Sequence, residues 1–499
     1  MKFKRITVIL LVIVMAMPTI LAACSSDNAK SDKDSNQAII EDGVEENSEE
    51  PVIEDIFAGL EAQTYDGREF NILAREDYVP QFYAAEETGD IINDAVYKRN
   101  RAVEDRFDVR INVIPNPGGW NEQTIRNSVM AGDGAYDLID GYAAYVGNIV
   151  MSQLYLNLLE VPHLRLTEAW WSQHAVNELT INNKLFIVPG DITLNLWETI
   201  MVVFFSKDIL KDHSLEDPYA LVKNGDWTLD KFIEMCKGVS ADLNGDGEMY
   251  EEDRYGSLLY DDLSFNNFHN AFDIPTTLKD AAGIPYFNLD SPDVYELAEK
   301  MYDFAAETGD IIYGNKAPGF KTQYSGGYPI VEMSLNMFAN NQILFYLSTL
   351  SDAEKLRSME TDFGILPYPK RNKEQAQYKT SSRDQHTMFG IPVDVKDVDF
   401  VGHITEALCV ASNKIVIPTY HDIALKDKFT RDEESQEMLD IIRAGLNFDF
   451  GIVFSSQLNS AGWVIRSCVN QTSFKFASTI ERSLPNYQKA LDKFLAALE

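Results

Sequence analysis

In the first part of the folded chain, segments with the apolar spacing of a strand alternate with segments that have the apolar spacing of a helix. Residues 68–74 and 109–114 alternate apolar with polar side chains, and residues 136–141 form a short apolar run typical of a buried strand. Between these strands, residues 91–107 and 124–130 carry apolar side chains at helical spacing. Strands and helices in turn favour parallel strands joined by crossover helices, so the pattern predicts an α/β fold.

The alternation of strands and helices continues through the rest of the chain. Further strands are predicted at 184–191, 200–205 and 362–366. Further helices are predicted at 208–222, 229–240, 292–307, 331–340, 398–412, 433–445 and 479–498.

The strand at 136–141 ends at a candidate ligand site. Ligands of parallel α/β sheets bind at the carboxyl ends of the strands, and Asp140 and Tyr142 lie at this end. Sugars have C–H faces that stack on aromatic rings and hydroxyl groups that need polar partners. An aspartate beside a tyrosine supplies both, so these two residues are predicted ligand contacts.

Four more side chains complete the predicted ligand site. Trp197, Tyr346 and Trp463 fall near predicted loops or strand ends, where a ring can serve as a platform for a sugar. The alternative for each ring is a place in the core. Arg383 lies in a polar segment and could bind hydroxyl groups or a carboxylate, its alternative being an ion pair with Asp384.

The first 23 residues have the features of a secretory signal. Lys2, Lys4 and Arg5 precede an apolar stretch that ends Leu-Ala-Ala before Cys24. This order predicts a lipobox, in which Cys24 becomes the new N-terminus and carries a diacylglyceryl group and an acyl chain such as palmitate. The alternative is an ordinary signal peptide followed by a chance cysteine. No second apolar run is expected to reach membrane-spanning length.

The segment after the lipobox is acidic and poor in aromatic residues. Residues 25–60 hold eleven Asp and Glu against two Lys, so residues 24–60 are predicted to form a flexible tether. The whole chain has a formal charge of −35, which excludes nucleic acid as a plausible partner. Cys236, Cys409 and Cys468 are an odd number beyond Cys24, and we expect them to be buried and unpaired.

A calcium-type loop begins at Asp242. Oxygen-bearing side chains occupy its first, third, fifth and twelfth positions, and glycine occupies the sixth, where calcium loops turn sharply. The predicted ligands of a structural Ca²⁺ are Asp242, Asn244, Asp246, the backbone carbonyl of Glu248, and Asp253. Aspartate in place of glutamate at the twelfth position predicts a weak site. The alternative is an Asx-rich turn without metal.

Several landmarks resemble the extracellular solute-binding proteins (family 1) of carbohydrate ABC importers, in the large lipoprotein branch common in Gram-positive bacteria. The resemblance covers nearly all of residues 64–499. The landmarks are the lipobox at Cys24 and the segments 136–141, 183–191, 203–207, 225–228, 242–256, 363–370 and 428–435.

The resemblance implies a type II periplasmic-binding-protein-like fold, in which two α/β lobes are joined by two or three crossing strands. Crossings are implied near 189–199 and 379–392. Asp140 and Tyr142 would face the cleft from the first lobe, Tyr346 from the second, and Trp197 from near the hinge. The implied domains are the signal peptide 1–23, the tether 24–60, a first lobe of 61–195 and 385–432, and a second lobe of 196–384 and 433–499.

The function implied is that of a monomeric, lipid-anchored binding protein on the extracytoplasmic face of the membrane. It would deliver a carbohydrate, expected to be an oligosaccharide, to ABC permease subunits without catalysing a reaction. No Gly-x-Ser-x-Gly, phosphate loop or His-Glu-x-x-His motif occurs. Three alternatives remain: a binding protein for peptides or other non-sugar solutes, a secreted lipoprotein glycoside hydrolase, and a purely structural surface lipoprotein.

Overall fold

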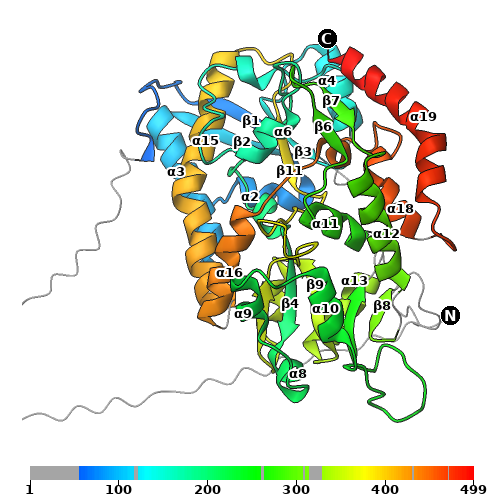
Figure 1. Ribbon diagram of the computed structural model, residues 1–499. Coiled ribbons are helices and arrows are strands. Elements are labelled where there is room, and N and C mark those ends of the chain that lie inside the picture. Colours follow the sequence, from blue (N-terminus) through cyan, green and yellow to red (C-terminus); the bar gives the residue numbers. More distant parts are fainter. Residues whose placement is uncertain are drawn as a thin grey trace, which may run out of the picture. The chain divides into compact units, whose positions relative to one another are not determined.

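Two sheets organise the part of the chain that the computed structural model describes. The described residues are 56–116, 122–259, 263–306, 309–313, 329–429, 432–469 and 471–498. One sheet has the strand order β11-β3-β1-β2 and the other the order β10-β4-β9-β5-β8, with helices around both (Figure 1). The predicted α/β class is confirmed.

The first sheet is built as the sequence pattern predicts. Strand β1 pairs in parallel with β2 and with β3, and helices α3 and α4 occupy the crossovers. The fourth strand, β11, comes from far along the chain and runs antiparallel to β3. The elements are β1 (Arg68–Arg75), α3 (Ile91–Phe107), β2 (Val109–Asn116), α4 (Glu122–Ala131), β3 (Leu138–Tyr142) and β11 (Thr387–Gly390).

The second sheet is mixed. Its strand β4 runs antiparallel to both neighbours, β10 and β9, and β5 runs parallel to β9 and β8. Every residue of β4 is buried, which fits its apolar run Met201–Phe205 before the final Ser206. The strands are β4 (Met201–Ser206), β5 (Tyr255–Leu259), β8 (Ile311–Tyr313), β9 (Ile343–Thr349) and β10 (Phe363–Leu366). A separate hairpin joins β6 (Thr277–Lys279) to β7 (Pro285–Phe287).

Most predicted helices form, with shifted ends. The helix predicted at 208–222 is two helices, because Pro218 begins a new one and the side chain of Asp217 caps its Tyr219 amide. Further helices are α6 (Gln173–Leu179), α7 (Asn195–Glu198), α11 (Leu263–Ala271), α12 (Pro292–Ala306), α13 (Pro329–Ala339), α15 (Val398–Pro418), α16 (Glu433–Ala444), α17 (Phe450–Val453), α18 (Val464–Val469) and α19 (Phe476–Ala497).

Helix α15 corrects one expectation. The helical stretch Val398–Ile423 is long and apolar enough to cross a membrane, although no such run was expected beyond the N-terminus. Within its most apolar window, 83% is buried inside the protein, and α15 packs along α3. Its apolar character therefore reflects a place in the core. The three cysteines behave as predicted: Cys236, Cys409 and Cys468 are buried and free of disulfides.

Three chain segments cross between the sheets side by side. The first, at 199–201, bonds to the second, at 380–383: Arg383 N donates to Thr199 O over 2.8 Å, and the Thr199 and Ser382 hydroxyl oxygens lie 2.7 Å apart. The second bonds to a third segment at 445–447, where Asn447 N donates to Thr380 O over 2.9 Å. The two crossings expected near 189–199 and 379–392 are therefore present, with a third after α16.

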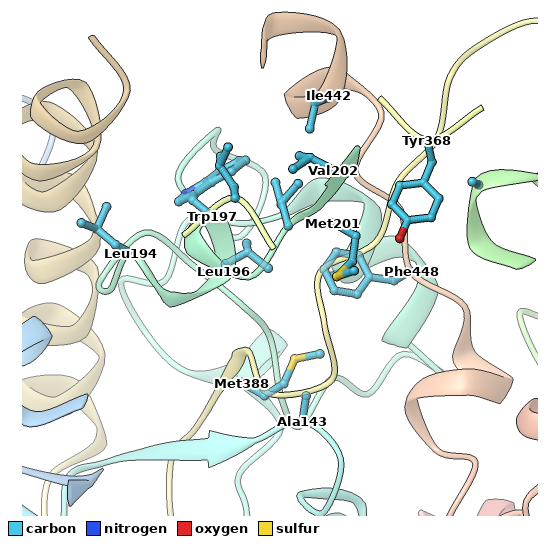
Figure 2. Close-up of a cluster of buried hydrophobic side chains, with 14 of the residues drawn as sticks. Ala143, Leu194, Leu196, Trp197, Met201, Val202, Tyr368, Met388, Ile442 and Phe448 are labelled. Atoms are coloured by element: carbon cyan, nitrogen blue, oxygen red, sulfur yellow. The ribbon is translucent and has the colours of Figure 1, made fainter. Parts of the chain in front are cut away.

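A buried apolar cluster packs around these crossings. Figure 2 shows Leu194, Leu196 and Trp197, at and just before α7, gathered with Met201 and Val202 at the start of β4. The same cluster receives Met388 from β11, Ile442 from α16 and Phe448 from just after the third crossing segment. The links are thus held by packing as well as by backbone hydrogen bonds.

The strands of the two sheets fall within the two predicted lobes, but the chain ends differ from the prediction. Near the C-terminus, Lys184 Nζ donates to Leu498 O over 2.5 Å and Gln153 Nε2 to Ala497 O over 2.6 Å, so this stretch contacts first-lobe residues. Near the N-terminus, Phe57 is buried and packs edge-on against Phe107. The folded body therefore begins at or before Phe57, within the predicted tether.

Candidate ligand cleft

Two adjoining hollows lie against the crossing segments. The central cavity is bounded by Ala143, Arg383, His386 and Trp463, and its floor includes Phe448. The polar cavity has a volume of about 220 Å³. Its lining includes His174, Glu178, Asp273 and Lys279. Asn270, Asn447, Phe448 and Asp449 line both hollows, so the two adjoin, and together they are the candidate cleft.

Two buried acceptors without partners line the central cavity. His386 is 4% exposed and Asn447 is 8% exposed. His386 Nδ1 lies 2.7 Å from Arg383 O, to which it donates, so the neutral ring presents Nε2 as an acceptor. Burial lowers the pKa of His386 to about 4, which keeps the ring neutral at neutral pH. Neither His386 Nε2 nor Asn447 Oδ1 has a hydrogen-bond partner among the described residues.

Aromatic rings form part of the same cavity. Phe448 is nearly buried and meets the His386 ring edge-on, with 5.6 Å between centroids. Trp463 is half-buried, and the guanidinium of Arg466 lies 4.5 Å from the centre of its ring. Rings beside unpaired acceptors suit a ligand that has both apolar C–H faces and hydroxyl donors.

The second crossing segment supplies charged side chains to the cavity. Arg383 and Asp384 both line it. Burial raises the pKa of Asp384, although the nearby Arg383 charge opposes this shift. Ala144 N donates to Asp384 O over 3.1 Å, which ties the loop after β3 to the crossing segment. The structure thus brings together two of the predicted contacts, Arg383 and Trp463.

Asp140 has another role in the structure. It lies inside β3 opposite Phe389, is 1% exposed, and pairs with Arg75 at 3.0 Å. Its carboxylate accepts three bonds from Arg75, including the backbone amide, so Asp140 holds β1 to β3 and presents no surface to a ligand. Tyr142 is half-buried against Tyr145, and burial raises its pKa to about 12. It lies next to the cavity residue Ala143 but does not itself line the cavity.

Tyr346 and Trp197 also lie outside the central cavity. Tyr346 is 1% exposed, stacks on Phe204 and Phe338, and donates to Asp352, so it belongs to the core of the second sheet. Trp197 is 9% exposed and donates to Asp191 over 3.0 Å.

The ring of Trp197 lines a separate crossing cavity of about 550 Å³. There, Arg443 lies 5.1 Å from the centre of the ring. Burial raises the pKa of Asp191, on the same wall, to about 6.

The calcium-type loop is held together by its own hydrogen bonds. The Asp242 carboxylate accepts the amides of Gly245 and Gly247 at 2.6 and 2.9 Å. Asp253 is buried, and its two oxygens accept the amides of Leu243 and Tyr250. Across the described ranges, no three His, Cys, Asp or Glu side chains are placed to share a metal ion. The residues as they lie match the Asx-rich turn, and calcium binding stays a prediction.

The calcium prediction is tested by thermal unfolding. If the loop binds Ca²⁺, saturating calcium should raise Tm by roughly 2 °C over a chelator-treated sample, because a ligand of the folded state stabilises it. Asp242→Ala should abolish the shift, whereas Asp280→Ala, in the turn between β6 and β7, should leave it intact. Equal Tm values with and without calcium would refute the site.

The sequence reasoning missed His386, Asn447, Phe448 and Asp449. His386 stood in the polar segment that drew attention to Arg383. The Asn447-Phe448-Asp449 run was a usable signal, since a ring between two polar side chains lies in the segment shortly after the end of α16. A second signal was the set of amides on α11 that reach the cleft, Asn266, Asn267 and Asn270.

Comparison with family models gave no match, and comparison with curated proteins gave none either. Solved structures do match. An ABC substrate-binding protein from Listeria monocytogenes in complex with cycloalternan has a TM-score of 0.52 at 12% identity, covering 86% of this chain and 100% of that one. An extracellular solute-binding protein from Staphylococcus aureus in complex with maltose has a TM-score of 0.53 at 11% identity, covering 87% and 98%.

A third match is an ABC transporter solute-binding protein from Thermotoga lettingae bound with α-D-tagatose. It has a TM-score of 0.52 at 13% identity and covers 85% of this chain and 100% of that one. At such identities the likeness concerns the fold. The chain therefore has the two-lobe fold of the solute-binding proteins of ABC transporters.

Proposed function

We propose that this protein is an extracytoplasmic binding protein that holds a carbohydrate in the cleft between its lobes and delivers it to an ABC importer. One observation carries the proposal: in a cavity lined by aromatic rings, two buried acceptors, His386 Nε2 and Asn447 Oδ1, find no hydrogen-bond partner within the part of the chain that the structure describes. A buried polar atom without a partner costs free energy that a ligand hydroxyl can offset. Support also comes from fold neighbours whose structures hold cycloalternan and maltose.

Different residues of the cleft contact different parts of the sugar. His386 and Asn447 accept hydroxyl hydrogens, while Arg383 donates to ring or hydroxyl oxygens. Phe448 and Trp463 pack against C–H faces. The protein makes and breaks no bonds, and the lobes close around the ligand by bending at the crossing segments.

Calorimetry with a panel of oligosaccharides and peptides tests the proposal. Stoichiometric binding of an oligosaccharide that is recovered unchanged supports it. Binding of peptides alone would reassign the ligand, and shortened sugars would reveal a hydrolase. If no ligand in the panel binds, the proposed function is wrong.

Removing an acceptor or an aromatic ring from the central cavity should weaken the binding of the sugar. We expect His386→Phe and, separately, Trp463→Ala to reduce affinity about tenfold, because each removes a hydrogen bond or a packing surface from the ligand. Met130→Ala, on the surface of α4 at 81% exposure, is the control and should bind like the parent. Circular dichroism checks that each variant folds. Unchanged affinity in both cavity variants would place the ligand elsewhere.

Lipid anchoring is part of the proposal. Cys24 and residues 1–55 lie outside the described residues, so this step depends on the lipobox alone. We expect Cys24→Ser to move the protein from the membrane fraction to the medium, since the acyl chains are its only proposed attachment. Cys468→Ser, at a buried thiol in α18, should stay with the membrane. A Cys24→Ser protein that remains membrane-bound would contradict the anchor.

A further inference from the structure

The polar cavity carries an excess of negative charge. Three carboxylates line it, those of Glu178, Asp273 and Asp449, against one ammonium group, that of Lys279. Lys279 Nζ is already engaged: it donates to Asn177 O over 2.5 Å and to Thr180 O over 3.1 Å at the end of α6. Among the described residues that line this cavity the carboxylates outnumber the ammonium group, and a further cation, Lys379, acts on its wall at His174.

Glu178 has a carboxylate oxygen that is still able to accept a hydrogen bond. Its Oε1 accepts the amide of Phe450 over 3.2 Å, while Oε2 takes no hydrogen bond from the described residues. Burial raises the pKa of Glu178, and the Lys279 charge opposes only part of that shift. A cationic ligand group beside Oε2 would compensate the remainder.

The other carboxylates of the polar cavity are hydrogen-bonded or exposed, and its histidines add no positive charge. Asp449 uses its oxygens for Thr276 and the amide of Ile452, and Asp273 is exposed at the rim. His174 Nδ1 accepts the amide of Phe448 over 3.1 Å, which requires a neutral ring. Burial lowers the pKa of His269, whose Nε2 donates to Ile274 O.

A separate observation marks the boundary between the two cavities as a ligand position. Asn447 lines both hollows and is 8% exposed. Its Nδ2 donates to Asn270 O over 3.2 Å, so the amide orientation leaves Oδ1 as an acceptor without a partner.

We propose that the polar cavity binds the protonated amine of an amino sugar, with Glu178 Oε2 and Asn447 Oδ1 as acceptors. This rests on the proposed function and narrows its ligand to oligosaccharides that carry a free amine. The neighbouring sugar unit then occupies the central cavity against Phe448.

The test compares two ligands that differ in one group. A β-1,4-linked glucosamine trisaccharide has free amines, and its N-acetylated counterpart has none. We expect the full-length protein to bind the free-amine sugar about tenfold more tightly, since a charge-assisted hydrogen bond is lost on acetylation. Glu178→Gln should remove this preference, and Glu299→Gln, on the exposed face of α12, should preserve it.

The outcomes separate the two proposals. Equal binding of both trisaccharides, or a preference that survives in Glu178→Gln, overturns the amine site and leaves carbohydrate binding standing. If neither trisaccharide binds but another oligosaccharide does, the amine site is also wrong. If no sugar binds, the proposed function fails and the amine site fails with it. The comparison in the parent protein needs no variant, so a misfolded Glu178→Gln protein leaves the test decisive.

Discussion

Replacing Arg99 with alanine is expected to lower the free energy of unfolding by about 3–5 kcal/mol, through the cavity it leaves and the hydrogen bonds it removes. Arg99 is fully buried in α3, and no carboxylate among the described residues forms an ion pair with it. Its guanidinium donates to Ile192 O and Phe82 O, each over 2.6 Å, and to Ser412 Oγ over 3.0 Å. Burial lowers the pKa of Arg99 to about 9, so the group keeps its charge at neutral pH.

Two further variants identify which interaction causes the loss of stability in Arg99→Ala. Arg99→Met keeps much of the volume and removes the donors, so a loss equal to that of alanine would assign the effect to hydrogen bonds. Lys98→Ala, next to it on α3, should change stability by less than about 1 kcal/mol, because its ion pair with Glu87 is exposed. Denaturant unfolding measures all three. An Arg99→Ala protein as stable as the parent would contradict the prediction.

Glu406→Ala is expected to cost about 3–5 kcal/mol, because it leaves a charged donor and two buried donors without an acceptor. The Glu406 side chain is fully buried in α15. It accepts the indole N–H groups of Trp170 and Trp171 over 2.9 and 3.0 Å, and Arg165 Nε over 2.9 Å. One carboxylate thus fixes two adjacent tryptophans against the core helix.

A matched pair of variants isolates the Glu406 network. Glu406→Gln retains one oxygen acceptor and should lose less stability than alanine. Asp399 lies at the exposed start of the same helix, and its one ion pair among the described residues is with His163 at 3.0 Å, so Asp399→Ala should lie within about 1 kcal/mol of the parent. Tryptophan fluorescence and denaturant unfolding follow the change. Equal stability of Glu406→Ala and Asp399→Ala would show that the network contributes nothing.

The first sheet could be predicted because its signals are local. The segments that became β1, α3, β2 and α4 each show a clear period in their own residues, and their order implies parallel pairing. Strands β5 and β9 gave no such signal. Tyr255–Leu259 and Ile343–Thr349 are buried along nearly their whole length, so their residues show no alternation between faces.

The site was harder to predict because its partners are distant in sequence. Asp140 looked like a free carboxylate at a strand end, yet its partner Arg75 lies 65 residues away. Trp463 and Arg383 were found by residue type, but nothing local shows that His386 and Asn447 meet at the same cavity. Only the contact between crossing segments brings these residues together.

The three crossing segments constrain how the two sheets can move. Thr380 joins both neighbours: its hydroxyl donates to Met201 O over 2.7 Å, and its carbonyl accepts the amide of Asn447. A sliding motion between the segments would break these hydrogen bonds together, whereas a rotation about the line of the Thr380 hydrogen bonds would keep them. We therefore expect the hydrogen bonds of Thr380 to form the hinge axis, and because Asn447 belongs both to this axis and to the lining of the cleft, a ligand held by its side chain should restrict the rotation.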